Sequence, residues 1–138
     1  LAGDIAAGAV QVRDLADRSI VTLRGDSVFD SGSADIAERE LPVFARIAAA
    51  LNRVPGPVIV AGHTDNQPIR SLRYPSNWHL SLARANHVKA LLAQSVNPSR
   101  LSAEGRADSE PVASNATAAG RAQNRRVEIT LLAAAPQS

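Results

Sequence analysis

The sequence predicts a single α+β domain in which two helices pack on one mixed sheet. Alternating apolar and polar residues over 19–23 and 127–132 are typical of strands. A continuous apolar run at 58–62 predicts a central strand that is covered on its faces. Apolar residues at helical spacing over 38–51 and 80–92 predict the two helices that would cover this sheet.

Length and composition restrict the kinds of protein that fit. The chain has 138 residues, the size of one domain, and no apolar run approaches the ~20 residues that cross a bilayer. Cysteine and methionine are absent, which excludes disulfides, thiolate metal sites and cysteine nucleophiles. Fifteen basic residues oppose thirteen acidic ones, and the net charge of +2 does not favour nucleic acid as a partner. Because the chain opens on Leu1 rather than Met, we expect a trimmed piece whose upstream segment would hold any signal or membrane helix.

The N-terminal part is predicted to lead into the sheet. Residues 10–13 alternate as well, so this segment predicts either a hairpin or a lead-in followed by a strand. The expected division of the chain is a lead-in with a possible first strand, a main domain and a frayed tail, at 1–18, 19–132 and 133–138.

The segments between these elements are rich in polar residues and turn formers. Residues 24–33 predict an ordered loop, because Val28 in its middle is expected to be tucked onto the core. Asn77 is a residue type that caps helices and is expected to start the second helix. A short strand at 101–105 and a polar loop at 107–120 complete the chain before the last strand.

The densest polar segment, residues 62–69, begins where the buried strand ends, and strand ends are where sheets present binding sites. Arg84 shares the inward face of the second helix, because it is four residues from both Leu80 and Val88. A guanidinium buried there needs an anion. Either Asp65 forms a structural ion pair with Arg84, or the two stay incompletely neutralised and receive a zwitterion. In that second case the Asp65 carboxylate attracts the ammonium of an amino acid, and the Arg84 guanidinium donates two parallel hydrogen bonds to the carboxylate of the same amino acid.

Other kinds of site remain open in the same region. A metal-dependent hydrolase would use His63 and Asp65, with His79 or His87 as a third ligand. A Ser–His–Asp hydrolase is disfavoured because no serine lies in a Gly-x-Ser-x-Gly elbow. The basic segment 120–126 would contact nucleic acid or dock a protein partner, but no aromatic residues are interleaved with it.

Four motifs follow one another along the chain. They are Phe29-Asp-Ser-Gly-Ser-Ala34, Gly62-His-Thr-Asp65, Asn77-Trp-His-Leu-Ser-Leu-Ala-Arg-Ala85 and Gly120-Arg-Ala-Gln-Asn-Arg-Arg-Val127. Together they resemble the OmpA-like C-terminal domain family, over residues 20–132. The resemblance implies a βαβαβ sandwich with two main helices on one mixed parallel and antiparallel sheet. It also implies a periplasmic domain without catalysis or cofactor that binds the peptidoglycan stem peptide through diaminopimelate.

The resemblance further implies which residues bind the ligand. Asp65 would bind the ammonium of diaminopimelate and Arg84 its carboxylate. Backbone donors would come from the loop at Phe29, Asp30, Ser31 and Gly32. The remaining residues of the pocket would be Thr64, Asn77, Leu80 and Arg125.

Within the family, the long segment 67–76 resembles two subgroups. The first is the wall-binding extension of TssL, the DotU/IcmH-like inner-membrane protein of type VI secretion, and the second is the flagellar stator protein MotB. The resemblance therefore implies the periplasmic part of an inner-membrane protein of a Gram-negative bacterium. Its partners would be peptidoglycan and other subunits of an envelope-spanning secretion complex, with membrane contact only through an upstream segment.

Overall fold

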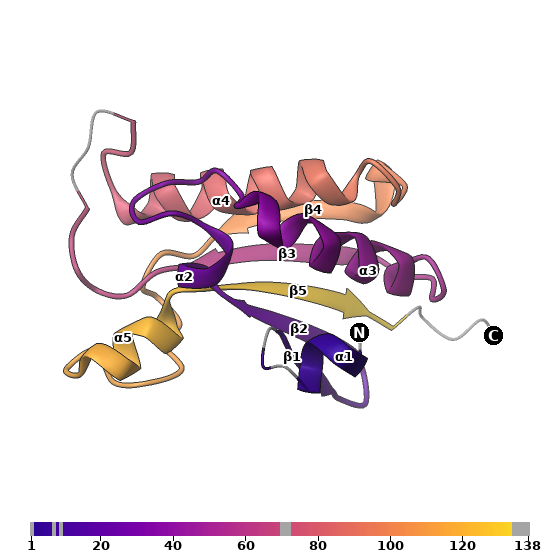
Figure 1. Cartoon of the computed structure of the whole chain (residues 1–138), viewed down its shortest axis with the longest axis horizontal. Helices are drawn as coiled ribbons and strands as arrows, with labels where there is room; N and C mark the ends of the chain where they lie inside the picture. The colour runs from indigo at the N-terminus through magenta and orange to yellow at the C-terminus, as the bar shows by residue number, and fades with distance from the viewer. Residues whose placement is uncertain (1, 7, 9, 70–72, 134–138) are drawn as a thin grey trace.

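One five-stranded sheet forms the centre of the computed structural model, which describes residues 2–6, 8, 10–69 and 73–133. The strands lie in the order β1-β2-β5-β3-β4 (Figure 1). Only the β3–β4 pair is parallel among these neighbours, and the other pairs are antiparallel. The predicted α+β class and mixed sheet are confirmed. The strands are β1 (Val10–Asp14), β2 (Arg18–Arg24), β3 (Val58–His63), β4 (Leu101–Gly105) and β5 (Arg126–Leu132).

Two long helices cover one face of the sheet, as predicted. They are α3 (Leu41–Leu51) and α4 (Asn77–Leu92), and both lie on the same side of the strands (Figure 1). The core between these two layers contains Phe44 of α3, Val88 of α4 and Ile129 of β5, each with at most 1% of its surface exposed. Within the described residues, no helix is both long and apolar enough to span a bilayer.

Of the two alternatives for the N-terminal segment, the structure has the hairpin, because β1 pairs antiparallel with β2 and Val12 faces Val21. Three short helices were not predicted. They are α1 (Ala2–Ala6), α2 (Gly25–Val28) and α5 (Ala118–Asn124). The sequence predicts loops for parts of the last two, because alanine, glycine and polar residues there show no apolar period of 3.6. Single 3₁₀ turns, η1 (Glu38–Glu40) and η2 (Pro98–Arg100), precede α3 and β4.

The start of α4 differs from the prediction by one residue. Ser76, not Asn77, caps the helix: its backbone is extended and its hydroxyl accepts a hydrogen bond from the His79 N–H. Asn77 is the first helical residue, and its side chain donates instead to the carbonyl of Gln67 at 2.9 Å. The side chain expected to cap the helix therefore fastens the loop that follows β3.

Two glycines let α4 approach the sheet closely. A Cβ on Gly62 of β3 would overlap the carbonyl oxygen of Ser81, and one on Gly105 of β4 would lie 2.6 Å from the backbone nitrogen of Leu82. Either contact is closer than packed atoms allow. The first half of α4 is thereby held directly over the C-terminal ends of β3 and β4, where the polar segment after β3 begins.

Candidate binding site

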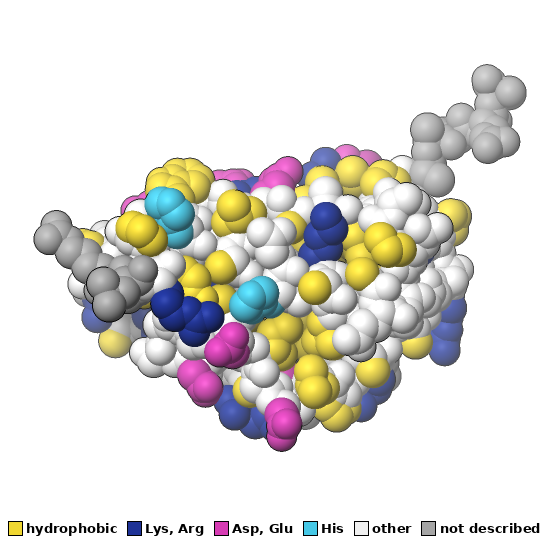
Figure 2. Space-filling model, turned by 90° about the horizontal axis from the view of Figure 1, so that it is seen from above, with side chains coloured by type: hydrophobic (Ala, Val, Ile, Leu, Met, Phe, Trp, Pro, Cys, Tyr) yellow, Lys and Arg dark blue, Asp and Glu magenta, His cyan; other side chains and the backbone are white. Residues whose placement is uncertain are grey.

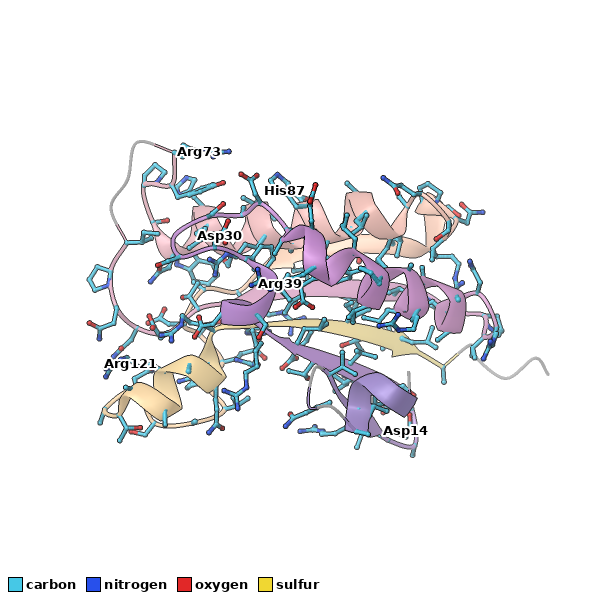
Figure 3. The ribbon with its side chains drawn as sticks, in the orientation of Figure 1. Asp14, Asp30, Arg39, Arg73, His87 and Arg121 are labelled. Carbon is cyan, nitrogen blue, oxygen red and sulfur yellow. The ribbon has the colours of Figure 1, made fainter. Side chains whose placement is uncertain are left out.

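The polar segment that follows β3 meets three other elements at one end of the molecule. Figure 2, which looks onto the helix-covered face, shows basic, acidic and histidine side chains in the left half of the view, with further basic side chains toward the right. Here the C-terminal end of β3, the N-terminal half of α4, α2 and the loop that follows α2 come together. In Figure 3, Asp30 lies on that loop where it passes α4.

Arg84 is buried on the inward face of α4, as its spacing predicts, with 7% of its surface exposed. Its Nε donates to the carbonyl of Ser33 at 2.7 Å, and its guanidinium carbon lies 4.7 Å from the centre of the Phe29 ring. One Nη also reaches the Asp30 carbonyl, at 3.5 Å. Burial lowers the pKa of Arg84. Within the described part of the chain no carboxylate forms an ion pair with this guanidinium.

Asp65 is equally buried but has a different partner from the one considered in the sequence. One carboxylate oxygen accepts from Arg125 Nη1 at 2.6 Å, and the other accepts from the Gln67 N–H at 2.9 Å. The Asp65–Arg84 ion pair, one of the two sequence interpretations, is therefore not formed. The preceding Thr64 donates its hydroxyl to the Asp65 carbonyl at 2.8 Å, which stiffens the backbone on which the carboxylate stands.

Arg125 joins Asp65 to a second carboxylate that the sequence did not suggest. Its Nε and second Nη fork the two oxygens of Asp26, each at 2.8 Å. This pairing raises the pKa of Arg125 and lowers the pKa of Asp26. Asp26 lies in a segment dense in turn formers, and its partner is 99 positions away, so no local pattern marks it.

The four charges of the site balance. Two carboxylates, Asp26 and Asp65, stand beside two guanidiniums, Arg84 and Arg125. Three of the four are linked by short ion pairs, whereas the partners of Arg84 in the described part of the chain are carbonyl oxygens and an aromatic face. The four side chains have no net charge, and the Arg84 guanidinium is not part of their ion pairs. Such a site suits a ligand that carries both a carboxylate and a cation.

The other predicted pocket residues position the two loops of the site. Asn77 holds the loop after Asp65 through Gln67, with a longer contact of 3.5 Å to the Asp65 carbonyl. Leu80 is buried in a small apolar cluster with Ala34 and Tyr74. Both therefore act on the walls of the site, and a direct contact with a ligand stays a prediction.

The loop after α2 places carbonyl oxygens toward the site. The carbonyls of Asp30 and Ser33 accept from Arg84, while Ser31 is exposed. Gly32 has a φ of +68°, which favours glycine, and a Cβ there would lie 3.9 Å from Ile69 Cδ1 of the opposing loop. The backbone donors implied by the resemblance stay a prediction.

The histidines do not assemble a metal site. His63 is buried in the sheet near Glu128, His79 contacts the Ser76 hydroxyl, and His87 contacts the Ala34 carbonyl at 2.6 Å. The described residues contain no group of three His, Cys, Asp or Glu side chains that could hold a metal ion. The hydrolase alternative therefore finds no ligand set in that part of the chain.

The basic segment 120–126 is engaged within the protein. Arg121 donates to the Asn115 carbonyl, Arg125 pairs with Asp26 and Asp65, and Arg126 pairs with Glu128 at 2.7 Å. This pairing leaves little support for a surface that docks nucleic acid or a protein partner. A cavity of about 660 Å³ lies elsewhere, on the strands β1, β2 and β5, with Thr22 and Glu128 in its wall.

Comparison with known proteins adds family information to this geometry. The profile described as the OmpA family matches residues 28–125. The solved structure of the cell wall anchor of the type VI secretion system (T6SS) from Pseudomonas aeruginosa is 56% identical, with a TM-score of 0.93, over 97% of this chain and 94% of that one. The periplasmic domain of Helicobacter pylori MotB is 29% identical, with a TM-score of 0.83, over 91% of this chain and 83% of that one.

A curated relative points in the same direction. Motility protein B of Bacillus subtilis is 40% identical over 116 residues, which are 82% of this chain and 44% of that protein. The chain spans about half the length of the curated relatives that it matches first.

Proposed function

Since this chain belongs to the OmpA family, we propose that it is a non-catalytic domain that binds peptidoglycan and anchors an envelope complex to the cell wall. The similarity to a wall anchor of a secretion system, at 56% identity, supports this role. The whole parent protein's partners are part of the proposal, because the chain matches only part of its curated relatives.

The ligand that we propose is diaminopimelate in the peptidoglycan stem peptide. The observation that carries this proposal is the buried guanidinium of Arg84, which is aligned by the Ser33 carbonyl and the Phe29 ring and has no carboxylate partner among the described residues. An incoming carboxylate would form a charge-assisted fork with it. Each oxygen of Asp65 accepts one hydrogen bond in the structure and keeps a further lone pair, to which the ligand ammonium would donate.

The envelope complex to which we assign the domain is also part of the proposal. The type VI secretion anchor supports a TssL-like parent, located in the periplasm and linked to other secretion subunits. The alternative is a MotB-like stator protein, supported by lower identities of 29% and 40%. In both cases the wall repeats its stem peptide many times, so several copies of a modest site would hold a complex firmly.

Co-sedimentation with insoluble peptidoglycan tests the function. The chain should sediment with diaminopimelate-type wall, and Arg84→Ala should stay in the supernatant because the carboxylate receptor is removed. The matched control is Arg53→Ala, an exposed arginine in the turn after α3, which should sediment like the unmodified chain. Arg84→Ala that is folded, as judged by circular dichroism, and still sediments fully would overturn the proposal.

Exchange of the wall type tests the ligand. Lysine lacks the carboxylate that Arg84 would bind, and leaving a buried charge unpaired in the complex costs about 2 to 5 kcal/mol. Lysine-type wall should therefore bind at least about tenfold more weakly. Equal sedimentation with both walls would contradict the assignment of diaminopimelate.

A further inference from the structure

We infer that Asp26 is a positioning residue for the ligand-binding carboxylate of Asp65. By accepting two hydrogen bonds from Arg125, Asp26 prevents that guanidinium from forming a two-bond pair with Asp65, whose carboxylate can then accept from a ligand ammonium. This inference rests on the proposed function, because it assigns a ligand to Asp65. Asp26 itself lies in α2, outside the motif that contains Asp65.

The geometry divides the donors of Arg125 between two carboxylates. The edge formed by Nε and one Nη binds both oxygens of Asp26 at 2.8 Å, and only the other Nη binds Asp65, at 2.6 Å. A guanidinium is planar and can present a full fork to one carboxylate at a time in this arrangement. Asp65 therefore receives a single hydrogen bond from Arg125.

That single bond decides what Asp65 can do. With one oxygen bonded to Arg125 and the other to the Gln67 N–H, the carboxylate keeps free lone pairs on both oxygens. If position 26 lost its charge, Arg125 would gain by turning its fork onto Asp65. A ligand ammonium would then compete with a bidentate guanidinium, and its contribution to affinity would fall.

The backbone around α2 makes this effect separable from folding. The Gly25 N–H donates to the Arg125 carbonyl at 2.7 Å, so α2 stays fastened to the start of β5 without the carboxylate of Asp26 (Figure 1). Asp26 and Arg125 are also partly exposed, at 55% and 31% of their side chains, so water can replace part of their pairing.

The charge of Asp26 also acts on Arg84, so the carboxylate and ammonium contributions must be measured separately. The probes are mono-N-acetylated meso-diaminopimelate, whose free end carries both an ammonium and a carboxylate, and N-acetyl-2-aminopimelate, whose distal end carries the carboxylate alone. Acetylation leaves neither probe a second amino-acid end that could enter the site. The dissociation constant of N-acetyl-2-aminopimelate divided by that of the acetylated diaminopimelate reports the ammonium contact, because a change at Arg84 affects both ligands.

Asp26→Asn should lower this ratio by about tenfold, whereas Arg125→Gln should raise it, because Asp65 would then face the ammonium without a competing cation. Asp26→Glu should restore the ratio, and Ser27→Ala, an exposed neighbour in α2, should leave it unchanged. Arg125→Met serves as a second variant if Arg125→Gln does not fold, and it should also raise the ratio because it too leaves Asp65 without a competing cation.

A purely structural pair predicts that Asp26→Asn and Arg125→Gln move the ratio in the same direction or not at all, and either result overturns the inference. If the unmodified chain distinguishes the two ligands while the folded Asp26→Asn variant keeps its ratio, only the role of Asp26 fails. If the unmodified chain binds neither ligand, the proposed function fails together with the inference.

Discussion

Acid should destabilise this domain through the buried histidine of β3. The side chain of His63 is 1% exposed, and neither ring nitrogen has a hydrogen-bond partner among the described residues. Glu128 Oε1 lies 3.7 Å from Nε2, but that carboxylate is already paired with Arg126 at 2.7 Å. Burial and the positive charge of Arg126 lower the pKa of His63 from 6.5 to about 4, against the opposing influence of Glu128.

The size of the effect follows from the two pKa values of this histidine. The unfolded chain takes up the proton near pH 6.5, whereas the folded chain resists it until about pH 4. The contribution of His63 is therefore fully present above pH 6.5 and is lost as the pH falls through this window. A difference of about 2.5 pKa units corresponds to about 3 kcal/mol of unfolding free energy.

Urea unfolding at a series of pH values measures this loss. The unmodified chain should lose about 3 kcal/mol between about pH 7.5 and about pH 4, and His63→Gln, which cannot titrate, should lose much less over the same interval. The difference between the two curves isolates His63 from carboxylates such as Asp26, whose lowered pKa places their effect at lower pH. Parallel curves for the two proteins would refute the assignment of the acid sensitivity to His63.

Two further predictions concern the packing that supports the site. Gly62→Ala should destabilise the domain by about 1 to 3 kcal/mol in urea unfolding, because its Cβ would overlap the Ser81 carbonyl and push α4 away from β3. The control Gly3→Ala, which has open space around its Cβ, should not be destabilised in this way. Equal stability of the two variants would contradict the close approach. Asn124 binds the backbone of residues 112–113 through three hydrogen bonds of 2.8 to 2.9 Å, so Asn124→Ala should cost about 2 to 3 kcal/mol and speed amide exchange at those residues. Unchanged exchange there would show that the loop is held by other contacts.

The regular elements of the sheet could be predicted because their sequence patterns are local. Alternation marks β2 and β5, a continuous apolar run marks β3, and helical spacing marks α3 and α4. The short α5 carries mostly alanine, glycine and polar residues, so its helix depends on the Thr117 cap and on packing rather than on a periodic pattern. Ser76 and Asn77 are both good capping residues, and only the loop geometry decides between them.

The candidate site was predictable in part. The burial of Arg84 follows from its position on the helix face, and the location of Asp65 follows from the end of a buried strand. The partners of both side chains were not predictable in the same way. Arg125 reaches Asp65 across 60 positions and Asp26 across 99, and carbonyl oxygens rather than a carboxylate hold Arg84. Such pairings are set by how the elements pack and leave no local signal.

A calorimetric titration of the chain with free meso-diaminopimelate, repeated on Arg84→Gln, measures whether Arg84 binds this ligand. We expect saturable binding of one ligand per chain, which Arg84→Gln abolishes while the variant's melting curve stays cooperative. Absence of binding to the unmodified chain, or equal affinity in the two proteins, would contradict this expectation.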